Sequence, residues 1–463
     1  MQHYTLCNIE KEVFRTYDIR GLVDTQLHTD AFYTLGKALS LRLIALNRQD
    51  VLVARDGRLT SEAYCQALKQ GLLDSGINVV DLGAVATPVM YYATHETAID
   101  SGLMLTGSHN PANYNGLKMV LAGTTLLDND ITELYNLIQK QQFVDGHGLE
   151  QYLDIMPRYL NRIKKDVTLH RPLKVVVDCG NGIAGPVIEA FMKQLGCDVI
   201  PLFCDVDGRF PNHHPDPTVE ANLVDLQQSV ALHQADVGLA FDGDADRLGV
   251  ITNTGDIIWP DRLMMFYTEA ILSQHPNATI VYDVKCSRHL TEVIERLGGK
   301  PRMCPTGHSI VKRIMKEEHA LFAGEMSGHL FFNDRWYGFD DALYSACRLL
   351  ELLSATPKTS HEQFATIPNS INTPEIKIPI DESLKFAFMK QFCEQAQFQD
   401  ATLITMDGLR AEFQHGWGLI RASNTTACLV ARFEAHDDEA LKSIQELFKT
   451  QLAAMNMAID IPF

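Results

Sequence analysis

The chain has 463 residues, 46% of them hydrophobic, and its 40 Lys and Arg residues against 58 Asp and Glu residues give a net charge of −18. This length is enough for three or four domains of about 100–150 residues each. The acidic balance argues against binding to nucleic acids or to an anionic membrane surface, since both need a basic face. No apolar run approaches the roughly 18 residues of a membrane span, and the first residues lack the apolar core of a signal peptide.

Ten cysteines are scattered through apolar segments and form no Cys-x-x-Cys pair. This distribution is typical of reduced core thiols rather than of disulfides or zinc ligands. We therefore expect a cytoplasmic protein.

Three similar α/β units are predicted in chain order. Each opens with an apolar strand that runs into a polar turn, at residues 51–57, 174–180 and 279–285. In each unit there follow a helix (60–74, 184–195, 288–297), a second strand (78–82, 198–203, 300–304), a further helix and a short final strand (102–105, 237–241, 320–323). Strands that alternate with helices predict mixed, mostly parallel sheets, and so an α/β fold.

The last part of the chain follows a different pattern. After a linker at 356–370, we expect a strand at 375–380, a helix at 383–395, strands around 409–413, 417–421 and 427–434, and a helix at 438–455. This order is typical of an α+β domain rather than of a fourth copy. With a border at 141–149, a helix from 151 and a turn at 253–256, the predicted domains are 1–153, 154–256, 257–368 and 369–463.

A polar loop follows the final strand of each α/β unit, and α/β sheets bind ligands at the carboxyl ends of such strands. The first loop, Thr106-Gly107-Ser108-His109-Asn110-Pro111, places a serine hydroxyl in a tight turn. The second, Asp242-Gly243-Asp244-Ala245-Asp246-Arg247, holds a carboxylate at every other position. In an extended backbone these three side chains share one face, and a cluster of hard oxygens suits Mg²⁺. A serine that can carry phosphate beside a magnesium loop indicates phosphoryl transfer through a phosphoserine.

Each loop also has a plainer interpretation. A serine in a turn most often serves the backbone through its hydroxyl, and the aspartates resemble the start of a calcium-binding loop. The calcium interpretation fails because Arg247 stands where the invariant glycine is needed and Asn253 where the bidentate glutamate belongs. An enzyme with Asp242 or Asp244 as a phosphorylated nucleophile stays open at this point.

Further residues are candidates for holding an anionic substrate. The run Arg421-Ala422-Ser423-Asn424-Thr425 offers a guanidinium, hydroxyls, an amide and successive N–H groups, and an arginine fork matches phosphate oxygens. By itself such a run is usually a surface turn. Other single groups, whose ordinary role is structural or solvated, are Arg20, Arg247, Lys285, His308 and His329.

Taken together, these segments resemble the α-D-phosphohexomutase superfamily. The resemblance begins at Phe14-Arg15-Thr16-Tyr17-Asp18-Ile19-Arg20-Gly21, passes through the three loops and ends at the Arg421 run, so it covers nearly the whole chain. The variants Thr-Gly-Ser108, Gly-Glu-Met326 and Ser-Asn424-Thr are similar to the bacterial phosphomannomutase/phosphoglucomutase branch. Phosphoglucosamine mutases more typically carry Ser-Ala-Ser-His-Asn-Pro and Gly-Glu-Gln-Ser-Gly-His.

The resemblance implies four domains around a central cleft: a phosphoserine, a metal-binding, a sugar-binding and a phosphate-binding domain, the last with a TATA-binding-protein-like fold. It implies an isomerase that interconverts the 6-phosphates and 1-phosphates of mannose and glucose. Phosphorylated Ser108 and a hexose 1,6-bisphosphate would be intermediates, with glucose 1,6-bisphosphate as activator. One Mg²⁺ would be held by Asp242, Asp244, Asp246 and Ser108. The expected partners are small sugar phosphates, and the expected state is a monomer.

The resemblance also assigns the other site residues. The positions that match the surroundings of the transferring phosphate are Arg20, Lys118, Arg247 and His329. The positions that match substrate contacts are Tyr17, Lys285, His308, Glu325, Met326, Ser327, Gly328, His329, Arg421, Ala422, Ser423, Asn424 and Thr425. The sugar proton needs a base, for which His329 and Lys118 are both candidates, Lys118 only if its pKa is depressed. A phosphoglucosamine mutase, a metal-dependent sugar-phosphate phosphohydrolase and a sugar-phosphate sensor remain alternatives.

Overall fold

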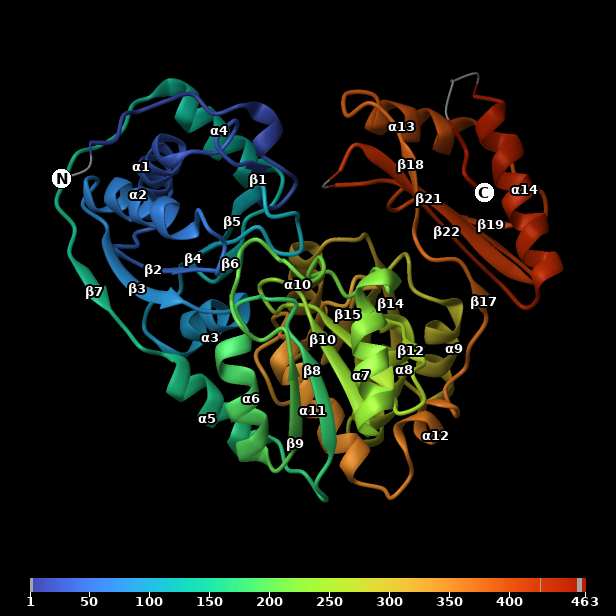
Figure 1. The fold of residues 1–463 in the computed structure, drawn as a ribbon. Helices are drawn as coiled ribbons and strands as arrows, with labels where there is room; N and C mark the ends of the chain where they lie inside the picture. Colours follow the sequence, from blue (N-terminus) through green and yellow to red (C-terminus); the bar gives the residue numbers. More distant parts are fainter. Residues whose placement is uncertain (1–2, 425, 456–459) are drawn as a thin grey trace.

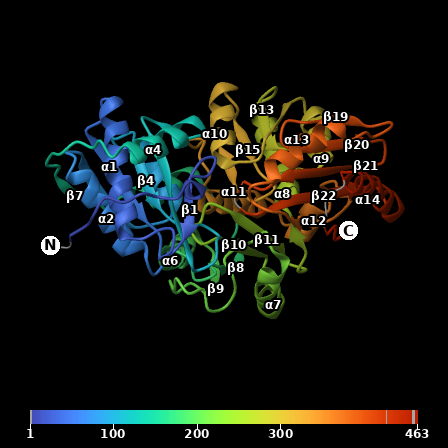
Figure 2. The same ribbon diagram turned by 90° about the horizontal axis from the view of Figure 1, so that it is seen from above.

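The computed structural model describes residues 3–424, 426–455 and 460–463, and in this part of the chain four sheets are surrounded by helices (Figure 1). The units follow one another along the chain, from blue at the left of Figure 1 through green and yellow to red at the upper right. Seen from above, the first and last units lie at opposite ends of the molecule, with the second and third between them (Figure 2).

The first two units are α/β units, as the sequence predicts. The first comprises η1 (Lys11–Val13), β1 (Ile19–Leu22), α1 (Thr29–Ala45), β2 (Asp50–Arg55), α2 (Ser61–Leu73), β3 (Asn78–Ala84), α3 (Thr87–Glu96), β4 (Gly102–Leu105), β5 (Tyr114–Leu121), β6 (Thr124–Thr125), α4 (Asn129–Lys140) and β7 (Glu150–Tyr152). The second comprises α5 (Met156–Asp166), β8 (Lys174–Asp178), α6 (Gly185–Leu195), β9 (Asp198–Leu202), η2 (Glu220–Leu223), α7 (Val224–His233), β10 (Val237–Phe241), β11 (Leu248–Thr252) and β12 (Ile257–Ile258).

The third unit repeats this pattern and the fourth departs from it. The third comprises α8 (Pro260–Gln274), β13 (Thr279–Asp283), α9 (Arg288–Arg296), β14 (Lys300–Cys304), α10 (His308–Glu317), β15 (Phe322–Gly324), β16 (Leu330–Phe332), α11 (Ala342–Ser354) and α12 (Ser360–Phe364). The fourth comprises β17 (Ile371–Asn372), β18 (Ile376–Pro379), α13 (Lys385–Gln395), β19 (Thr402–Ile404), β20 (Leu409–Phe413), β21 (Gly416–Ala422), β22 (Cys428–Ala435) and α14 (Asp438–Ala453).

The three α/β sheets share one strand order. Their central strands run β5-β4-β2-β3, β11-β10-β8-β9 and β16-β15-β13-β14. In each sheet, the third strand in this order (β2, β8 or β13) is parallel to both of its neighbours. The first strand in this order (β5, β11 or β16) is antiparallel to the strand beside it. The predicted repeat of mixed, mostly parallel sheets is confirmed. The fourth sheet is antiparallel throughout and carries α13 and α14, so the predicted α+β domain is confirmed as well.

Helix starts follow from local chemistry. A proline lies in the first turn of α3, α5, α6 and α8, where its missing N–H costs nothing.

Two predictions about where helices lie are wrong. Residues 150–152 form β7 rather than a helix, and α5 begins only at Met156, directly before Pro157. The predicted linker at 356–370 contains α12, which begins with a capping box between Thr359 and Glu362.

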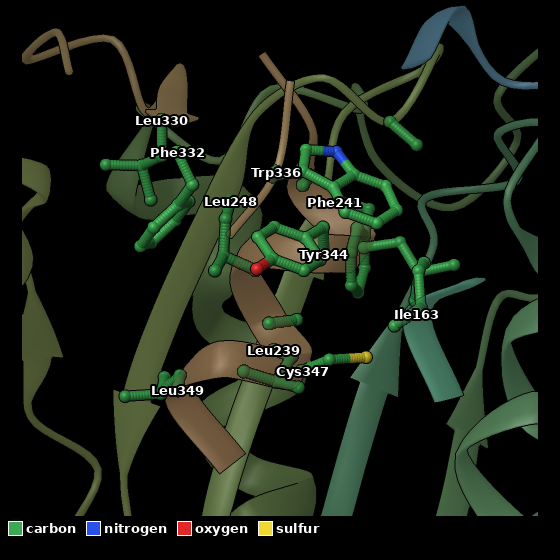
Figure 3. Packing of buried hydrophobic residues seen from close by; sticks show 14 of the residues in the cluster. Ile163, Leu239, Phe241, Leu248, Leu330, Phe332, Trp336, Tyr344, Cys347 and Leu349 are labelled. Atoms are coloured by element: carbon green, nitrogen blue, oxygen red, sulfur yellow. The ribbon is translucent and has the colours of Figure 1, made fainter. Parts of the chain in front are cut away.

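One hydrophobic core runs through the three α/β units and contains residues from Leu52 to Ile367. Trp336 and Tyr344 stack with ring centroids 4.2 Å apart, beside Phe241 of β10 (Figure 3). Fully burying a large apolar side chain stabilises a fold by about 1.5–3 kcal/mol. The shared core therefore fixes the three α/β units relative to one another.

The fourth unit has a core of its own and meets the third unit through a smaller contact. Val284 packs there against Trp417 and Leu419. The buried guanidinium of Arg410 lies 3.8 Å from the Trp417 ring centroid and donates to the carbonyls of Val284 (2.6 Å) and Cys286 (2.7 Å). A planar cation between an aromatic ring and carbonyls is a specific contact, so it sets how the fourth unit sits on the third.

Among the described residues, no helix is both long and apolar enough to cross a membrane. All ten cysteines are free thiols.

Candidate functional site

The three polar loops occupy the same place in the three α/β sheets. Residues 106–113 connect β4 to β5, residues 242–247 connect β10 to β11, and residues 325–329 connect β15 to β16. Each loop turns the chain from a parallel strand into its antiparallel partner. Side-chain hydrogen bonds join the first loop to the second and the second to the third.

Ser108 lies in the first loop with its hydroxyl turned toward the second. Its backbone is in the left-handed region (φ +49°), and its amide donates to Thr106 Oγ1 at 2.8 Å. Its buried Oγ donates to Asp242 Oδ2 at 3.2 Å and lies 3.2 Å from His109 Nδ1. A left-handed residue other than glycine costs roughly 1–2 kcal/mol, so contacts around the loop must hold the serine in this conformation.

Arg20 on β1 provides some of these contacts. One guanidinium nitrogen donates to the carbonyl of Gly107 at 2.7 Å and also to Asn110 Oδ1. The other pairs with Asp18 Oδ2 at 2.6 Å. Burial works against the charge of Arg20, but the Asp18 carboxylate raises its pKa, so the cation persists beside the Ser108 loop.

The three aspartates of the second loop are fully buried, and one oxygen from each lies within 4.8 Å of the others. The prediction that an extended backbone aligns them is wrong. Residues 243–245 form a turn, in which Ala245 has φ +60° and its amide donates to the carbonyl of Asp242 at 3.1 Å. Asp242 Oδ1 accepts the amides of Asp246 (3.0 Å) and Arg247 (3.1 Å), so a turn rather than a pleat gathers the carboxylates.

The loop's charges are strongly coupled. Burial, with repulsion from the two neighbouring carboxylates, holds the pKa of Asp242 well above its usual range. Burial acts in the same direction on Asp244, but the Lys118 ammonium (2.7 Å) and the Thr87 hydroxyl (2.6 Å) at Oδ2 keep its pKa below the usual value. Burial alone would lower the pKa of Lys118, but Asp244 and Asp246 hold it well above its usual range. Lys118 therefore does not meet the condition for a general base in this arrangement.

These residues fit a divalent cation. Of the three buried carboxylates, Asp244 and Asp246 pair with the Lys118 ammonium, and Asp244 Oδ1 and Asp246 Oδ1 have no hydrogen-bond partner among the described residues. Buried carboxylate oxygens without a partner are costly, and oxygen ligands of this kind suit Mg²⁺. Asp242, Asp244 and Asp246 are thus the residues that would hold a metal beside Ser108.

Arg247 joins the second loop to the third. Its Nε donates to His329 Nε2 at 3.0 Å. The other ring nitrogen, Nδ1, lies 3.0 Å from Asp340 Oδ2 and 3.4 Å from Asp246 Oδ1. The His329 ring also stacks on that of His308, with centroids 5.3 Å apart. Both nitrogens of the predicted base therefore lie beside charged groups.

Tyr17 extends this row of rings, since it meets His308 edge-on at a centroid distance of 5.0 Å. Burial raises the pKa of Tyr17 to about 12. Burial, with the nearby Lys312 ammonium, lowers the pKa of His308 to about 3. Both side chains are thus neutral at physiological pH and offer hydrogen bonds rather than charge.

The third loop is held by hydrogen bonds of its own. Glu325 Oε1 accepts the amide of Gly307 at 2.6 Å, and burial raises the pKa of this carboxyl. The amide of Met326 donates to Asp283 Oδ1 at 3.0 Å. These bonds anchor the loop to the end of β13 and to the start of α10.

Gly328 makes the turn that returns the loop to β16. It has φ +93°, a conformation that favours glycine, and its amide donates to the carbonyl of Glu325 at 3.0 Å. Its own carbonyl accepts the amide of Leu248 on β11 at 3.1 Å. Ser327, beside it, is half-buried.

Lys285 and Arg421 are buried cations paired with acids. Lys285 Nζ lies 2.7 Å from Glu375 Oε1, and although burial opposes the charge, Glu375 raises the pKa of Lys285 to about 12. Arg421 Nε donates to Asp407 Oδ2 at 2.8 Å. Arg421 Nη2 has no hydrogen-bond partner among the described residues. A buried guanidinium nitrogen of this kind is suited to an incoming anion.

Asn424 of the Arg421 run contacts the third unit. Asn424 Nδ2 donates to the carbonyl of Thr306 at 3.4 Å. Ala422 is the buried last residue of β21, and Ser423 Oγ lies 2.8 Å from Thr426 Oγ1. Thr425, predicted as a substrate contact, lies outside the described residues.

Sequence families cover the chain almost from end to end. "Phosphoglucomutase/phosphomannomutase, alpha/beta/alpha domain I" matches residues 11–145, domain II residues 157–255, domain III residues 259–370, and the C-terminal domain residues 375–451. The chain belongs to the phosphoglucomutase/phosphomannomutase family.

Individual family members are similar over the same span. A phosphomannomutase/phosphoglucomutase from Pseudomonas aeruginosa is 49% identical over 451 residues, which is 97% of each chain. A phosphoglucomutase from Neisseria meningitidis is 46% identical and covers 96% of this chain and 97% of its own length. A crystal structure of a family protein from Burkholderia thailandensis superposes with a TM-score of 0.93 at 44% identity, over 98% of this chain and 100% of the other.

Sequence reasoning missed several residues that hold the candidate site residues in place. These are Asp56 and Arg58 beside the Ser108 loop, Thr87 on Asp244, Asp340 beside His329, and Asp407 on Arg421. Only the first pair left a usable signal, because Asp56 and Arg58 directly follow β2 at the same sheet edge as the Ser108 loop. The others are single residues whose partners are distant in the sequence.

Proposed function

We propose that this chain is a phosphohexomutase that interconverts the 1-phosphates and 6-phosphates of glucose and mannose through a phosphoserine at Ser108. One observation carries the proposal: the buried Ser108 hydroxyl lies 3.2 Å from an oxygen of the Asp242, Asp244 and Asp246 cluster. The names of the relatives, phosphomannomutase/phosphoglucomutase and phosphoglucomutase, support the same substrates.

In the first half-reaction, a hydroxyl of the bound sugar attacks the phosphorus of phosphorylated Ser108, and the bond from phosphorus to Oγ breaks. His329 Nε2 accepts the hydroxyl proton, and Oγ takes up a proton as it leaves. Arg247 donates to that Nε2 in the structure. For Nε2 to accept the proton, this donor must first leave it.

In the second half-reaction, the hexose 1,6-bisphosphate presents its other phosphoryl group to Ser108. Oγ gives up the proton it took up and attacks that phosphorus, while the bond from phosphorus to the sugar oxygen breaks and this oxygen takes the proton held by His329 Nε2. The phosphoserine is restored and the isomerised sugar phosphate is left. Arg421, whose Nη2 has no hydrogen-bond partner in the described part of the chain, and Lys285 hold whichever phosphate is not reacting. Mg²⁺ bound to the three aspartates would neutralise charge that develops on the transferring phosphoryl group.

The first unit thus carries the phosphoserine, the second the metal ligands, the third the sugar contacts through Glu325 and Ser327, and the fourth the phosphate contacts. We further propose glucose 1,6-bisphosphate as activator, a monomeric state and a cytoplasmic location.

The test is an assay of purified protein with glucose 1-phosphate and a trace of glucose 1,6-bisphosphate. We expect glucose 6-phosphate as product, and one phosphate at Ser108 by intact mass and peptide mapping. Ser108→Ala should abolish turnover. Ser40→Ala is the matched control, because the Ser40 hydroxyl donates only to a carbonyl within α1. Asp242→Asn should lower kcat far more than it raises KM, since the lost interaction acts on developing charge.

Two outcomes would contradict the proposal. Full activity of Ser108→Ala would exclude the covalent mechanism. Release of inorganic phosphate at the rate of turnover would make the chain a phosphohydrolase instead.

A further inference from the structure

Arg58 lies against the Ser108 loop. It follows β2 and is only 4% exposed. One guanidinium nitrogen donates to the carbonyls of Pro111 (2.7 Å) and Tyr114 (3.0 Å). The other donates to the carbonyls of Ser108 (2.7 Å) and Asn110. A single side chain thus binds three carbonyls of one short loop and that of Tyr114, the first residue of β5.

Asp56 completes this arrangement from the same turn. Its Oδ2 accepts the amide of Gly107 at 3.2 Å and lies 3.3 Å from Arg58 Nε. Its Oδ1 accepts the Arg58 amide at 3.0 Å. The carboxylate therefore fixes the guanidinium and the start of the Ser108 loop together.

The backbone of the loop lies flat against this guanidinium. A Cβ at Gly107 would lie 2.4 Å from Arg58 Nε, so the glycine leaves the space that Arg58 occupies. On its other side, Arg58 packs over the ring of Phe210 from the second unit, 5.1 Å from the ring centroid. The guanidinium is thus held between two units of the fold.

These contacts stabilise the backbone conformation of Ser108. Ser108 has a left-handed backbone (φ +49°), which is unfavourable for a residue with a side chain. Its amide is held by Thr106 Oγ1 at 2.8 Å and its carbonyl by Arg58 at 2.7 Å. With both peptide groups fixed, the hydroxyl is directed at Asp242.

We propose that Arg58 is the positioning residue of the phosphoserine loop: its planar fork binds three loop carbonyls and the carbonyl of Tyr114 at the start of β5, and holds Ser108 in the conformation that reacts. This inference rests on the proposed function. A lysine cannot replace the fork, because an ammonium is a point charge and not a planar set of donors. A displacement of about 1 Å in a reacting group can cost about 100-fold in rate.

The experiment compares wild type, Arg58→Ala and Arg58→Lys, with Arg209→Ala as control. Arg209 is exposed and pairs with Asp207 in the same segment as Phe210. We expect Arg58→Ala to lower kcat about 100-fold and to change KM less than about threefold, since the hydrogen bonds of the Arg58 guanidinium go to the Ser108 loop and to Tyr114 rather than to the expected sugar contacts. Arg58→Lys should stay near the alanine variant, and Arg209→Ala near wild type. Millimolar guanidinium, far below denaturing concentrations, should restore part of kcat in Arg58→Ala only.

A second readout needs no catalysis. Hydrogen exchange of the peptide that spans residues 106–114 should be faster in both Arg58 variants than in wild type. If wild type itself lacked mutase activity, the proposed function would fail, while this exchange measurement would still test Arg58. If Arg58→Ala did not fold, Arg58→Lys would carry both measurements. Wild-type kcat in Arg58→Lys, or unchanged exchange in the 106–114 peptide, would overturn the inference.

Discussion

Replacing Asp341 with asparagine should make the protein less sensitive to rising pH. Asp341 caps α11, where its Oδ1 accepts the amide of Tyr344 at 2.9 Å. Its two oxygens also lie 2.8 and 3.0 Å from the hydroxyl of Tyr159. The side chain is buried in the shared core, and this burial raises its pKa from 3.8 to about 7. An asparagine keeps the cap and a hydrogen bond to the phenol but carries no charge.

The sign and size of the effect follow from linkage. Because the folded-state pKa of Asp341 lies above the unfolded one, its contribution to stability is fully present below about pH 4 and is lost as pH rises through about 7. A rise of about three pKa units corresponds to about 4 kcal/mol in all. The difference in free energy of unfolding, Asp341→Asn minus wild type, should therefore increase by about 3 kcal/mol between about pH 5 and pH 8.5.

Urea unfolding at the two pH values, followed by tryptophan fluorescence, measures this difference. Trp336 is a suitable reporter because it stacks on Tyr344 in the same core. Asp437→Asn is the matched control, since Asp437 is the exposed cap of α14. Equal pH dependence in wild type and Asp341→Asn would refute the reasoning. An increase in the stability of wild type relative to Asp341→Asn as pH rises would also refute it.

Three further outcomes are expected. Thr87→Val should lower the free energy of urea unfolding by about 2 kcal/mol, since it loses a buried 2.6 Å hydrogen bond to the Asp244 carboxylate. Thr94→Val is the control, because it loses a hydrogen bond to a helix carbonyl. An equal loss of stability in both variants would contradict the prediction. Lys285 outweighs burial to lower the pKa of Glu375 to about 2, so wild type should lose stability as pH falls from about 4.5 toward 2. Glu375→Gln should lack that dependence in acid unfolding, and an unchanged acid transition would contradict this. The kcat/KM values for glucose 1-phosphate and mannose 1-phosphate should be similar, and the value for glucosamine 1-phosphate should be at least about tenfold lower. The reason is that Glu325 and its loop are expected to bind hydroxyls away from C2. A preference for glucosamine 1-phosphate would place the chain in the neighbouring phosphoglucosamine mutase branch.

The repeat of the α/β units was predictable because each unit shows the same succession of apolar strands, helices and polar loops in the sequence. The way the Asp triplet converges was not. The period of two that suggested an extended strand is real in the sequence, but the chain turns at Ala245 instead. A left-handed residue other than glycine leaves no reliable mark in a single sequence. The convergence was expected for the wrong reason.

The supporting residues were beyond reach for a different reason. Asp340 lies beside His329, and Asp407 binds Arg421, through contacts that depend on how the units are placed against one another. Nothing local marks such an aspartate as different from one that faces solvent. Arg58 is the intermediate case, since its place after a parallel strand was visible, but its four carbonyl partners were not.

The repeat itself explains how one fold supplies three kinds of chemistry. The loops after β4, β10 and β15 are equivalent in strand order, so a shared core holds them in fixed relation whatever side chains they carry. The three loops then differ in the side chains they carry: a serine in the first, three aspartates in the second and a histidine in the third. The bonds from Ser108 to Asp242 and from Arg247 to His329 cross between units. A displacement of any one loop must therefore disturb the others, which is why residues that fix a loop, such as Arg58, should affect turnover without touching the sugar.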